Sequence, residues 1–475
     1  MNKFLLLTII GCLQFYFGNS QNAYKIDVTI KAFANQQIYL GYYFGKTFPI
    51  KDSVKLDAAG KGSFKGKEKL VGGIYLLGYP SKSEYVEMLI DKNQTFAISI
   101  DSPLQKKGIR LTNSPEGSEF QAYQNFMEAN GKALQALDKL NTSNTTTPKT
   151  ITQKKKAIND AVNKYRETII AKGTKNLLPA ILNLLKIPIV PDVTKMPNGK
   201  YDSTYAWYYY KSNYWNGVNF ADERLLRTPI YESKFDDYFK TIIYPQPDSI
   251  INEADKILVA SIANTETFKF NTTKLIQRYI NPEYMGQDAV YVHLFEKYIA
   301  PGTANWFDEK QKKFLFDRGY SLISNKIGDP APALDLVDTL GNPISLYNIK
   351  SNYTVICFWD ATCGHCKEVV PSVDSIYKAK WKQQGVTLLG VMTDGGLQNW
   401  KTYITEHQFT NWIHAYQTDE NRKKDNADGK PNFRQLYDIV STPKLYLLDK
   451  DKHIIAKQLT YQQLDDLLNK KLENK

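Results

Sequence analysis

Residues 357–371, with the sequence CFWDATCGHCKEVVP, hold three of the four cysteines of this 475-residue chain. The apolar run before Cys363, from Tyr353 to Trp359, is typical of a buried strand. Apolar residues then recur at helical spacing, at Val369, Val370, Val373 and Ile376. The stretch therefore predicts a strand that leads directly into a helix, with Cys363 and Cys366 at the start of that helix.

This position favours thiolate chemistry. The start of a helix offers unpaired backbone N–H groups and the positive end of the helix dipole, which stabilise an anion. Cys-x-x-Cys thiols at helix starts have pKa values lowered to about 3.5–7.5. Cys363 can then attack a disulfide of a partner, and Cys366 can resolve the mixed disulfide. His365 lies between them and, when protonated, adds positive charge beside the thiolate.

Other uses of a cysteine pair fit the sequence less well. Structural zinc needs four ligands, and neither a second Cys-x-x-Cys nor a His pair at ligand spacing accompanies this one. Covalent haem attachment needs a His directly after the second cysteine, where this chain has Lys367. A structural disulfide between Cys363 and Cys366 remains an alternative. We expect no metal and no cofactor.

Several separated features make residues 328–475 resemble the thioredoxin superfamily, and most of all its TlpA/ResA envelope branch. They are Phe358-Trp359, then Cys363-Gly364-His365-Cys366-Lys367, Pro371, and Ser441-Thr442-Pro443 before a late strand. The tetrapeptide Cys-Gly-His-Cys is the one found in protein disulfide isomerases. The resemblance implies a redox-active disulfide between Cys363 and Cys366.

The resemblance also implies roles for the surrounding residues. Pro443 is expected to be a cis-proline that faces the active-site sulfurs, with Thr442 offering backbone groups to a bound substrate strand. Trp359 is expected to shield the site and, with Gly364, to contact substrate. Pro371 would bend the active-site helix, as prolines inside helices do.

One departure from the family pattern concerns the proton carrier. Thioredoxins have a buried Asp six residues before the first active-site cysteine, where it helps to move the proton of the second one. This chain has Cys357 at that position. Asp360 or Glu368 is the candidate substitute. Cys357 itself is expected to pack in the core, with a redox role as the alternative.

The whole chain predicts a multidomain α+β protein. Period-2 alternation indicates an N-terminal antiparallel β domain over residues 21–112, and helical spacing indicates an all-helical middle domain over 113–325. After the proline-rich linker near Pro330, alternating strands and helices predict a C-terminal α/β thioredoxin-like domain over 328–475. The two front domains are similar to the domains of unknown function that precede TlpA-like modules in envelope proteins of Gram-negative bacteria.

The N-terminus predicts export. Lys3 is followed by an apolar run from Phe4 to Phe17, shorter than the ~20 residues that span a bilayer. We expect a signal peptide over residues 1–20, with lipidation at Cys12 as the alternative and the only expected route to a membrane anchor. The expected location is the periplasm or cell envelope of a Gram-negative bacterium. The net charge is +12, but dispersed lysines predict no nucleic-acid binding.

These features predict a protein thiol–disulfide oxidoreductase. Its expected partners are proteins with disulfides or thiols, an upstream thiol reductant or oxidant, and a second copy in a homodimer. One alternative is a binding or scaffold protein with an auxiliary redox module. The other is a thiol peroxidase, although Asp360 and Ile356 stand where peroxiredoxins have Thr and Pro. The sequence leaves open the direction of electron flow, the substrate proteins and the role of the front domains.

Overall fold

The computed structural model describes residues 22–142 and 148–473. The expected signal peptide and Cys12 lie outside the described residues. The chain divides into two compact units, Met1–Ile242 and Ile243–Lys475. The division falls inside the helical region, just before helix α6 (Pro247–Ser261).

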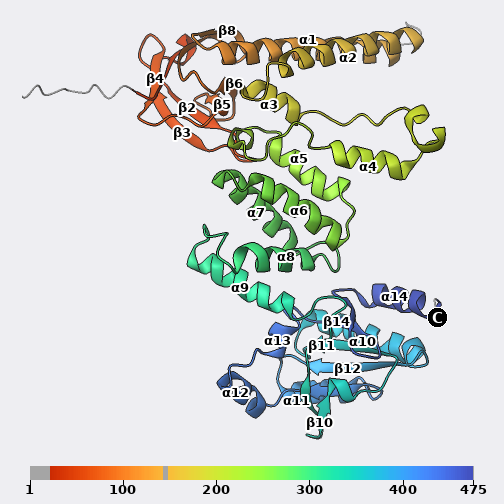
Figure 1. Cartoon of the computed structure of the whole chain (residues 1–475). Helices are drawn as coiled ribbons and strands as arrows, with labels where there is room; N and C mark the ends of the chain where they lie inside the picture. Colours follow the sequence, from red (N-terminus) through yellow and green to blue (C-terminus); the bar gives the residue numbers. More distant parts are fainter. Residues whose placement is uncertain (1–21, 143–147, 474–475) are drawn as a thin grey trace, which may run out of the picture. The chain divides into compact units, whose positions relative to one another are not determined.

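Two four-stranded sheets form the first part of the first unit (Figure 1). Their orders are β4-β1-β7-β8 and β3-β2-β5-β6. Apolar side chains that alternate along the strands meet in one core, which includes Ile26, Leu40, Leu77 and Ile98. The strands are β1 (Tyr24–Thr29), β2 (Gln37–Tyr42), β3 (Ile50–Lys55), β4 (Lys61–Gly66), β5 (Gly73–Gly78), β6 (Tyr85–Ile90), β7 (Thr95–Ser102) and β8 (Lys107–Thr112).

Apolar runs at residues 24–30, 37–43, 73–78, 86–90 and 95–100 predict five of these strands, β1, β2, β5, β6 and β7. The sequence misses β3, β4 and β8, which all lie at sheet edges. Edge strands are exposed and carry polar residues, so their apolar alternation is weak. The expected antiparallel pairing also has an exception among the described residues, because β1 and β7 are parallel. The strands between them in sequence belong partly to the other sheet, and this long connection allows the chain to return in the same direction.

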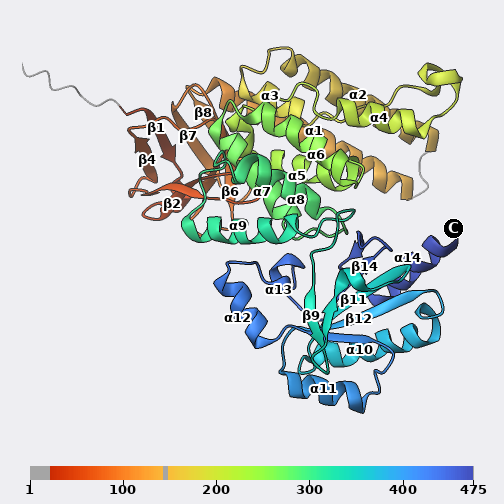
Figure 2. The ribbon, with the colours of Figure 1, turned by 60° about the horizontal axis from the view of Figure 1, so that its bottom comes forward.

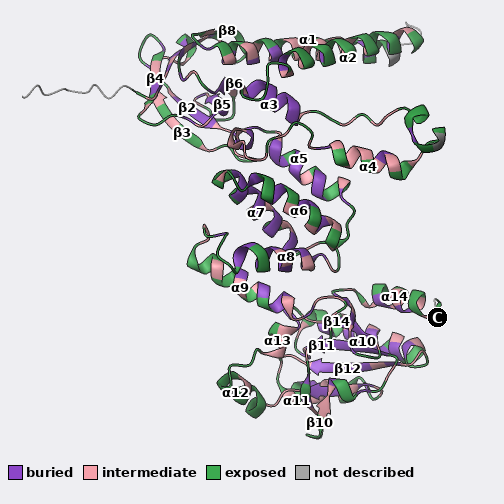
Figure 3. Cartoon of the chain, viewed as in Figure 1, coloured by how far each residue is buried: buried purple, intermediate pink, exposed green. Residues whose placement is uncertain are grey.

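Helices complete the first unit. Helix α3 is buried along its whole length, whereas α2 buries only Ile151, Val162 and Ile169 and shows its other faces to solvent (Figure 3). The helices are α1 (Pro115–Thr142), α2 (Pro148–Ile170), α3 (Leu177–Leu184), α4 (Ser203–Asn213) and α5 (Tyr231–Asp237). Nowhere in the described parts of the chain is a helix both long and apolar enough to cross a bilayer.

The second unit begins with four more helices and ends with an α/β domain. The first four helices are α6, α7 (Thr265–Tyr279), α8 (Asp288–Leu294) and α9 (Glu309–Ile323). Asp308 starts α9 with a capping box, in which its side chain accepts a hydrogen bond from the N–H of Gln311. The helices of the α/β domain are α10 (Gly364–Ile376), α11 (Leu397–Glu406), α12 (Asp419–Ala427), α13 (Phe433–Leu436) and α14 (Tyr461–Glu473).

A seven-stranded sheet of order β10-β9-β13-β12-β11-β14-β15 forms the centre of the α/β domain (Figure 2). Central strand β11 is buried throughout and pairs parallel with β12 and antiparallel with β14. The sequence predicts strands over 353–359, 386–392 and 444–448 and a helix over 397–406, which the structure confirms as β11, β12, β14 and α11. It does not predict β13, α12 or α13. The strands are β9 (Asp335–Asp338), β10 (Pro343–Ser345), β11 (Tyr353–Trp359), β12 (Val386–Met392), β13 (Ile413–Tyr416), β14 (Lys444–Leu448) and β15 (Ile454–Lys457).

The two faces of β11 belong to different cores because successive side chains point to opposite sides of the sheet. Cys357 and Trp359 pack in one cluster with Val370 of α10 and Leu464 of α14. Ile356 and Phe358 pack in the other, with Tyr437 just after α13. Both faces are thus covered, which explains why β11 reads as one continuous apolar run.

Buried charges connect α8 to the sheet. The ammonium group of Lys457, at the end of β15, donates hydrogen bonds to Asp288 and to the side chain and carbonyl of Asn325. The side chains of Lys457 and Asp288 are only 1% and 3% exposed. Since burial lowers the pKa of Lys457, these partners are what keeps the cation stable inside the protein.

We predict that Lys457→Met lowers the free energy of unfolding by about 3–5 kcal/mol, because it leaves the Asp288 carboxylate buried without its cation. Urea denaturation of the full chain measures this. The double variant Lys457→Met with Asp288→Leu should recover most of the loss, since it removes both charges. Lys313→Met, which breaks an exposed pair with Asp317, is the matched control and should change stability by less than about 0.5 kcal/mol. A loss below about 1 kcal/mol for Lys457→Met would contradict the argument.

Candidate active site

The two predicted catalytic cysteines lie at the end of β11 and the start of α10. Cys363 is the N-cap residue of α10, and Gly364 is the first residue of the helix. The cap makes no side-chain hydrogen bond to the helix, and the first N–H groups of a helix have no partner within it. Both cysteines are present as thiols. The sequence prediction of a strand-to-helix junction at this point is confirmed.

Cys363 is partly exposed and has an activated thiol. The backbone N–H of Cys366 is the main cause that lowers the pKa of Cys363, and the N–H of His365 lowers it further against the opposing effect of burial. The Sγ atom lies 3.6 Å from the carbonyl oxygen of Thr442, to which the thiol donates. The helix start therefore stabilises the thiolate of Cys363, as the sequence predicts.

Cys366 differs from Cys363 in both burial and acidity. Its side chain belongs to the core on one face of the sheet and is 1% exposed. Burial raises the pKa of Cys366 to about 11. At neutral pH the exposed sulfur is thus the better nucleophile, and the buried one keeps its proton until it acts.

The loop before β14 faces the cysteine pair. The Thr442–Pro443 peptide bond is cis, as the resemblance implies. Antiparallel pairing places Lys444 opposite Phe358, so the residues just before β14 meet the residues just after β11. This register explains how Thr442 reaches Cys363 across 79 positions of sequence.

His365, Glu368 and Gly364 lie on the exposed side of the helix start. The His365 side chain is 68% exposed, and its Nδ1 lies 3.7 Å from the Glu368 carboxylate. A side chain on Gly364 would meet no atom within 4 Å, so the surface above this residue is open. Glu368 is itself 80% exposed, which places it outside the buried environment expected of a proton carrier for Cys366.

Asp360, the other candidate proton carrier, organises the loop between strand and helix. Its carboxylate accepts hydrogen bonds from the N–H and hydroxyl of Thr362 at 2.7 and 2.8 Å. Its carbonyl oxygen accepts from the N–H of Cys363 at 3.3 Å. The structure thus gives Asp360 a loop-forming role, and the assignment of a proton carrier stays a prediction.

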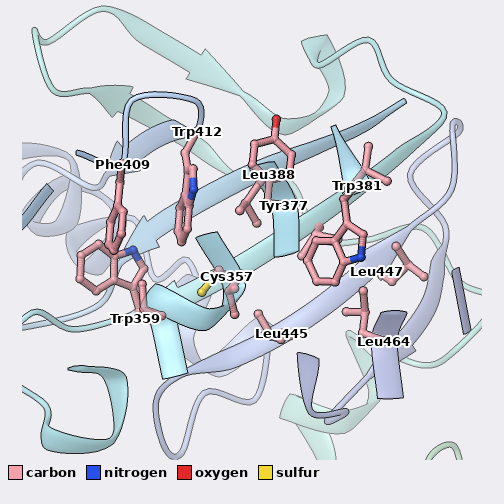
Figure 4. Close-up of a cluster of buried hydrophobic side chains, with 14 of the residues drawn as sticks. Cys357, Trp359, Tyr377, Trp381, Leu388, Phe409, Trp412, Leu445, Leu447 and Leu464 are labelled. Atoms are coloured by element: carbon pink, nitrogen blue, oxygen red, sulfur yellow. The ribbon is translucent and has the colours of Figure 1, made fainter. Parts of the chain in front are cut away.

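Trp359 lies elsewhere than the substrate surface expected for it. Its side chain is 1% exposed, and its ring packs against Trp400 and Tyr403. It also packs against Phe409, which lies beside it in Figure 4. The reason is the alternation along β11, which turns Trp359 to the same covered face as Cys357. Trp359 therefore packs in the core behind the site, and the substrate contact expected for it stays a prediction.

Cys357 is completely buried among apolar side chains, with Leu388 and Leu445 in the same cluster (Figure 4). Burial is the main cause that raises the pKa of its thiol above the usual range, and the charge of Cys366 adds to this effect. A thiol that keeps its proton and is shielded from solvent is a poor nucleophile. The structure agrees with the core-packing interpretation.

Three residues near the site were missed in the sequence. Asp438 comes from the loop before Pro443, Lys444 is the first residue of β14, and Arg318 comes from α9. Arg318 and Lys444 both donate to the Asp438 carboxylate. Arg318 lies 120 positions before Asp438, so no local pattern could reveal the contact. Among the described residues, no group of three or more His, Cys, Asp or Glu side chains is placed to hold a metal ion.

The β11–α10 junction, the unequal cysteine pair and the facing cis-proline define a thioredoxin-like redox domain. Residues 327–457 match the model of the AhpC/TSA family, and residues 142–321 match a domain of unknown function, DUF5106. No curated protein matches the chain. The C-terminal domain is therefore thioredoxin-like, and its similarity is to the AhpC/TSA family.

Several solved bacterial structures are similar to parts of the chain. A domain of a possible thiol-disulfide isomerase from Cytophaga hutchinsonii is 32% identical, with 31% of this chain and 97% of that chain covered and a TM-score of 0.28. A thiol:disulfide interchange protein from Bacteroides sp. is 30% identical, with 31% and 92% covered and a TM-score of 0.27. A thioredoxin-like protein from Bacteroides caccae is 23% identical over 60% and 97%, with a TM-score of 0.46.

We predict that iodoacetamide alkylates Cys363 at least about tenfold faster than Cys366 at pH 7, because only the thiolate reacts. The variant Cys366→Ser isolates Cys363, and Cys363→Ser isolates Cys366; mass spectrometry identifies the labelled residue. A lowered pKa means that the alkylation rate of Cys363 rises with pH at a midpoint below about 8.5, the ordinary thiol value. A midpoint at or above that value would contradict the argument for an activated thiol.

Cys357→Ala tests the third thiol. We expect it to lower the free energy of unfolding by about 1–2 kcal/mol, because it leaves a small cavity in the core. The rate of disulfide exchange by the folded variant should stay within about twofold of the unchanged protein, since the Cys363 and Cys366 sulfurs remain. A loss of exchange at full folding, checked by circular dichroism, would instead give Cys357 a redox role.

Proposed function

We propose that this chain exchanges disulfides with partner proteins in the bacterial cell envelope through its Cys-Gly-His-Cys site. The observation that carries the proposal is the inequality of the two thiols at the start of α10. Cys363 is accessible and has a lowered pKa, whereas Cys366 is buried and has its pKa raised to about 11. A metal site or a structural disulfide does not require two thiols of different accessibility and pKa. A two-step disulfide exchange does, because one thiol attacks the substrate and the other resolves the mixed disulfide.

In the reducing direction the thiolate of Cys363 attacks one sulfur of a substrate disulfide. A mixed disulfide forms, and the other substrate sulfur leaves as a thiolate and takes up a proton. Cys366 then loses its proton and attacks the Sγ of Cys363, which releases the first substrate sulfur as a second thiol. The substrate gains two electrons and two protons, and the Cys363–Cys366 disulfide carries the oxidation. The oxidising direction is the reverse.

Pro443 and Thr442 are the proposed substrate contacts. The Thr442 carbonyl lies 3.6 Å from the Cys363 sulfur, so a chain that pairs with this loop would pass beside the nucleophile. Gly364 leaves the approach open, because no atom lies where its side chain would stand. His365 is proposed to add positive charge near the thiolate when it is protonated.

The envelope location rests on the N-terminal sequence, where the apolar run from Phe4 to Phe17 follows Lys3. Thiol–disulfide exchange is also the chemistry expected of an oxidising compartment. An upstream thiol partner is needed to return the cysteine pair to its starting state after each turnover. A homodimer remains a prediction.

Fractionation of the native cells, with sequencing of the mature N-terminus, tests the proposed location. The same experiment distinguishes cleavage near Ser20 from lipidation at Cys12.

The insulin reduction assay tests the proposed activity on the purified chain with dithiothreitol as the reductant. We expect acceleration over dithiothreitol alone, and Cys363→Ser should reduce this acceleration to the background rate. Activity that survives Cys363→Ser would refute the proposal. Peroxide consumption measured on the same samples distinguishes the thiol peroxidase alternative.

Cys366→Ser provides the second arm of this test, because it stops the reaction at the mixed disulfide. Expressed in the native envelope, this variant should accumulate disulfide-linked partner proteins on Cys363 that thiol reductants release. The variant with both Cys363→Ser and Cys366→Ser is the matched control and should trap none. Equal recovery of partners by both variants would indicate non-covalent binding and favour the scaffold alternative.

A further inference from the structure

A cleft of about 540 Å³ lies beside the redox site and is built partly from outside the thioredoxin-like domain. Most of its lining comes from that domain: the start of α10, the loop around Pro443, and the residues that lead into α14. The rest comes from the helices, because Asn281 follows α7 and Arg318 lies on α9. Both residues precede residue 327, where the family match begins. His365 and Pro443 line the cleft. His365 lies two residues after Cys363, and Pro443 directly follows Thr442, whose carbonyl oxygen contacts the Cys363 sulfur.

The charged groups that line this cleft carry an excess of positive charge. Arg318 and Lys444 share a single carboxylate, that of Asp438, and the side chains of the three are 11%, 12% and 4% exposed. Burial lowers the pKa of Lys444, and the neighbouring cation Arg318 lowers it further against the effect of Asp438. One more negative charge would therefore be favourable at this place.

Arg318 also has hydrogen-bond capacity left for a ligand. Its guanidinium has five N–H donors. One donates to Asp438, one to the carbonyl of Ile280 at 3.1 Å, and one to the side chain of Asn281 at 3.1 Å. These contacts fix the guanidinium in place and leave donors for an incoming carboxylate. Arginine in this state binds carboxylates with defined geometry.

The rest of the cleft fits an extended peptide. The side chains of Ser441, Gln458 and Gln462 make no hydrogen bond to other described residues, and they offer both donors and acceptors. Val440, at the same cleft, is 80% exposed and gives an apolar contact. Amide and hydroxyl groups along an open cleft suit the alternating N–H and C=O groups of a peptide backbone.

We propose that this cleft is a specificity subsite of the redox site, which takes an extended segment of a substrate protein with an acidic side chain near its reactive cysteine. The carboxylate binds Arg318, with Lys444 as the second cation. The helical region thus selects substrates for a cysteine pair that it does not itself contain. This inference rests on the proposed function, since it names the substrates of that same site.

The test compares three peptides of one sequence that carry an intermolecular disulfide and have Glu, Gln or Lys two residues from the cysteine. The full chain is reduced first, and the single-turnover rate constant for each peptide is measured by stopped-flow fluorescence. We expect the Glu peptide to react about fivefold faster than the Lys peptide, the scale of a partly exposed ion pair. The ratio should shrink as salt is raised, because salt screens such pairs.

Variants of α9 then assign the preference to Arg318. Arg318→Gln should bring the ratio of Glu to Lys rates close to one, and Arg318→Lys should restore part of it. Lys313→Gln removes the same charge from the same helix outside the cleft and should leave the ratio unchanged. Because each ratio is taken within one variant, a general loss of rate or stability does not affect it. Lys444→Gln is the second variant and should also lower the ratio, so the test stands even where Arg318→Gln fails to fold.

The outcomes separate this inference from the proposed function. Equal rates for the three peptides with the unchanged chain would overturn the subsite while leaving the redox activity intact. A preference that survives both Arg318→Gln and Lys444→Gln would overturn it as well. Failure to reduce any peptide, or reduction that persists in Cys363→Ser, would instead refute the proposed function, and the subsite would fall with it.

Discussion

The pairing of β11 with β14 is the constraint on which the redox site depends. It places Lys444 opposite Phe358, and by this register the loop that contains Pro443 meets the loop that contains Cys363. Neither loop has regular structure of its own to hold it. A shift of the β11–β14 register by one residue would turn every side chain of β14 to the other face of the sheet. Such a shift is unfavourable because it would disrupt the packing of the apolar clusters on both faces. The 3.6 Å approach of Thr442 to Cys363 is thus fixed by hydrogen bonds along the strands behind it.

Burial gives the two cysteines of the site, Cys363 and Cys366, different roles. Both cysteines belong to the start of α10, but one turn of helix moves Cys366 from the surface into the core. The backbone N–H groups that stabilise the thiolate of Cys363 point outward from the helix end, and the apolar cluster that raises the pKa of Cys366 lies behind it. The difference in acidity between the two thiols follows mainly from the helix start and from burial.

The sequence predicted those parts of the fold that are buried and local. The β11 run and the apolar stripe of α10 show clear periods because each element has a face or a whole surface in the core. Edge strands such as β3 and β8 were missed because solvent imposes no such pattern on them. The cysteine pair could be found from spacing alone, whereas Arg318 could not, since its partner is 120 residues away. By analogy Trp359 was expected to shield the site and contact substrate, whereas the alternation of its own strand turns its side chain into the core.

The contact between Lys457 and Asp288 crosses the boundary of the redox domain as the family match defines it. The family match ends at residue 457 and begins at 327, but the partners of Lys457 lie at Asp288 and Asn325, before that beginning. The segment that matches the family therefore does not contain the residues that neutralise its own buried Lys457. A lineage that joined this module to a different N-terminal region would have to carry α8 with it, or exchange Lys457 for an apolar residue. The helical region thus supplies buried polar groups that the redox domain needs for its own stability.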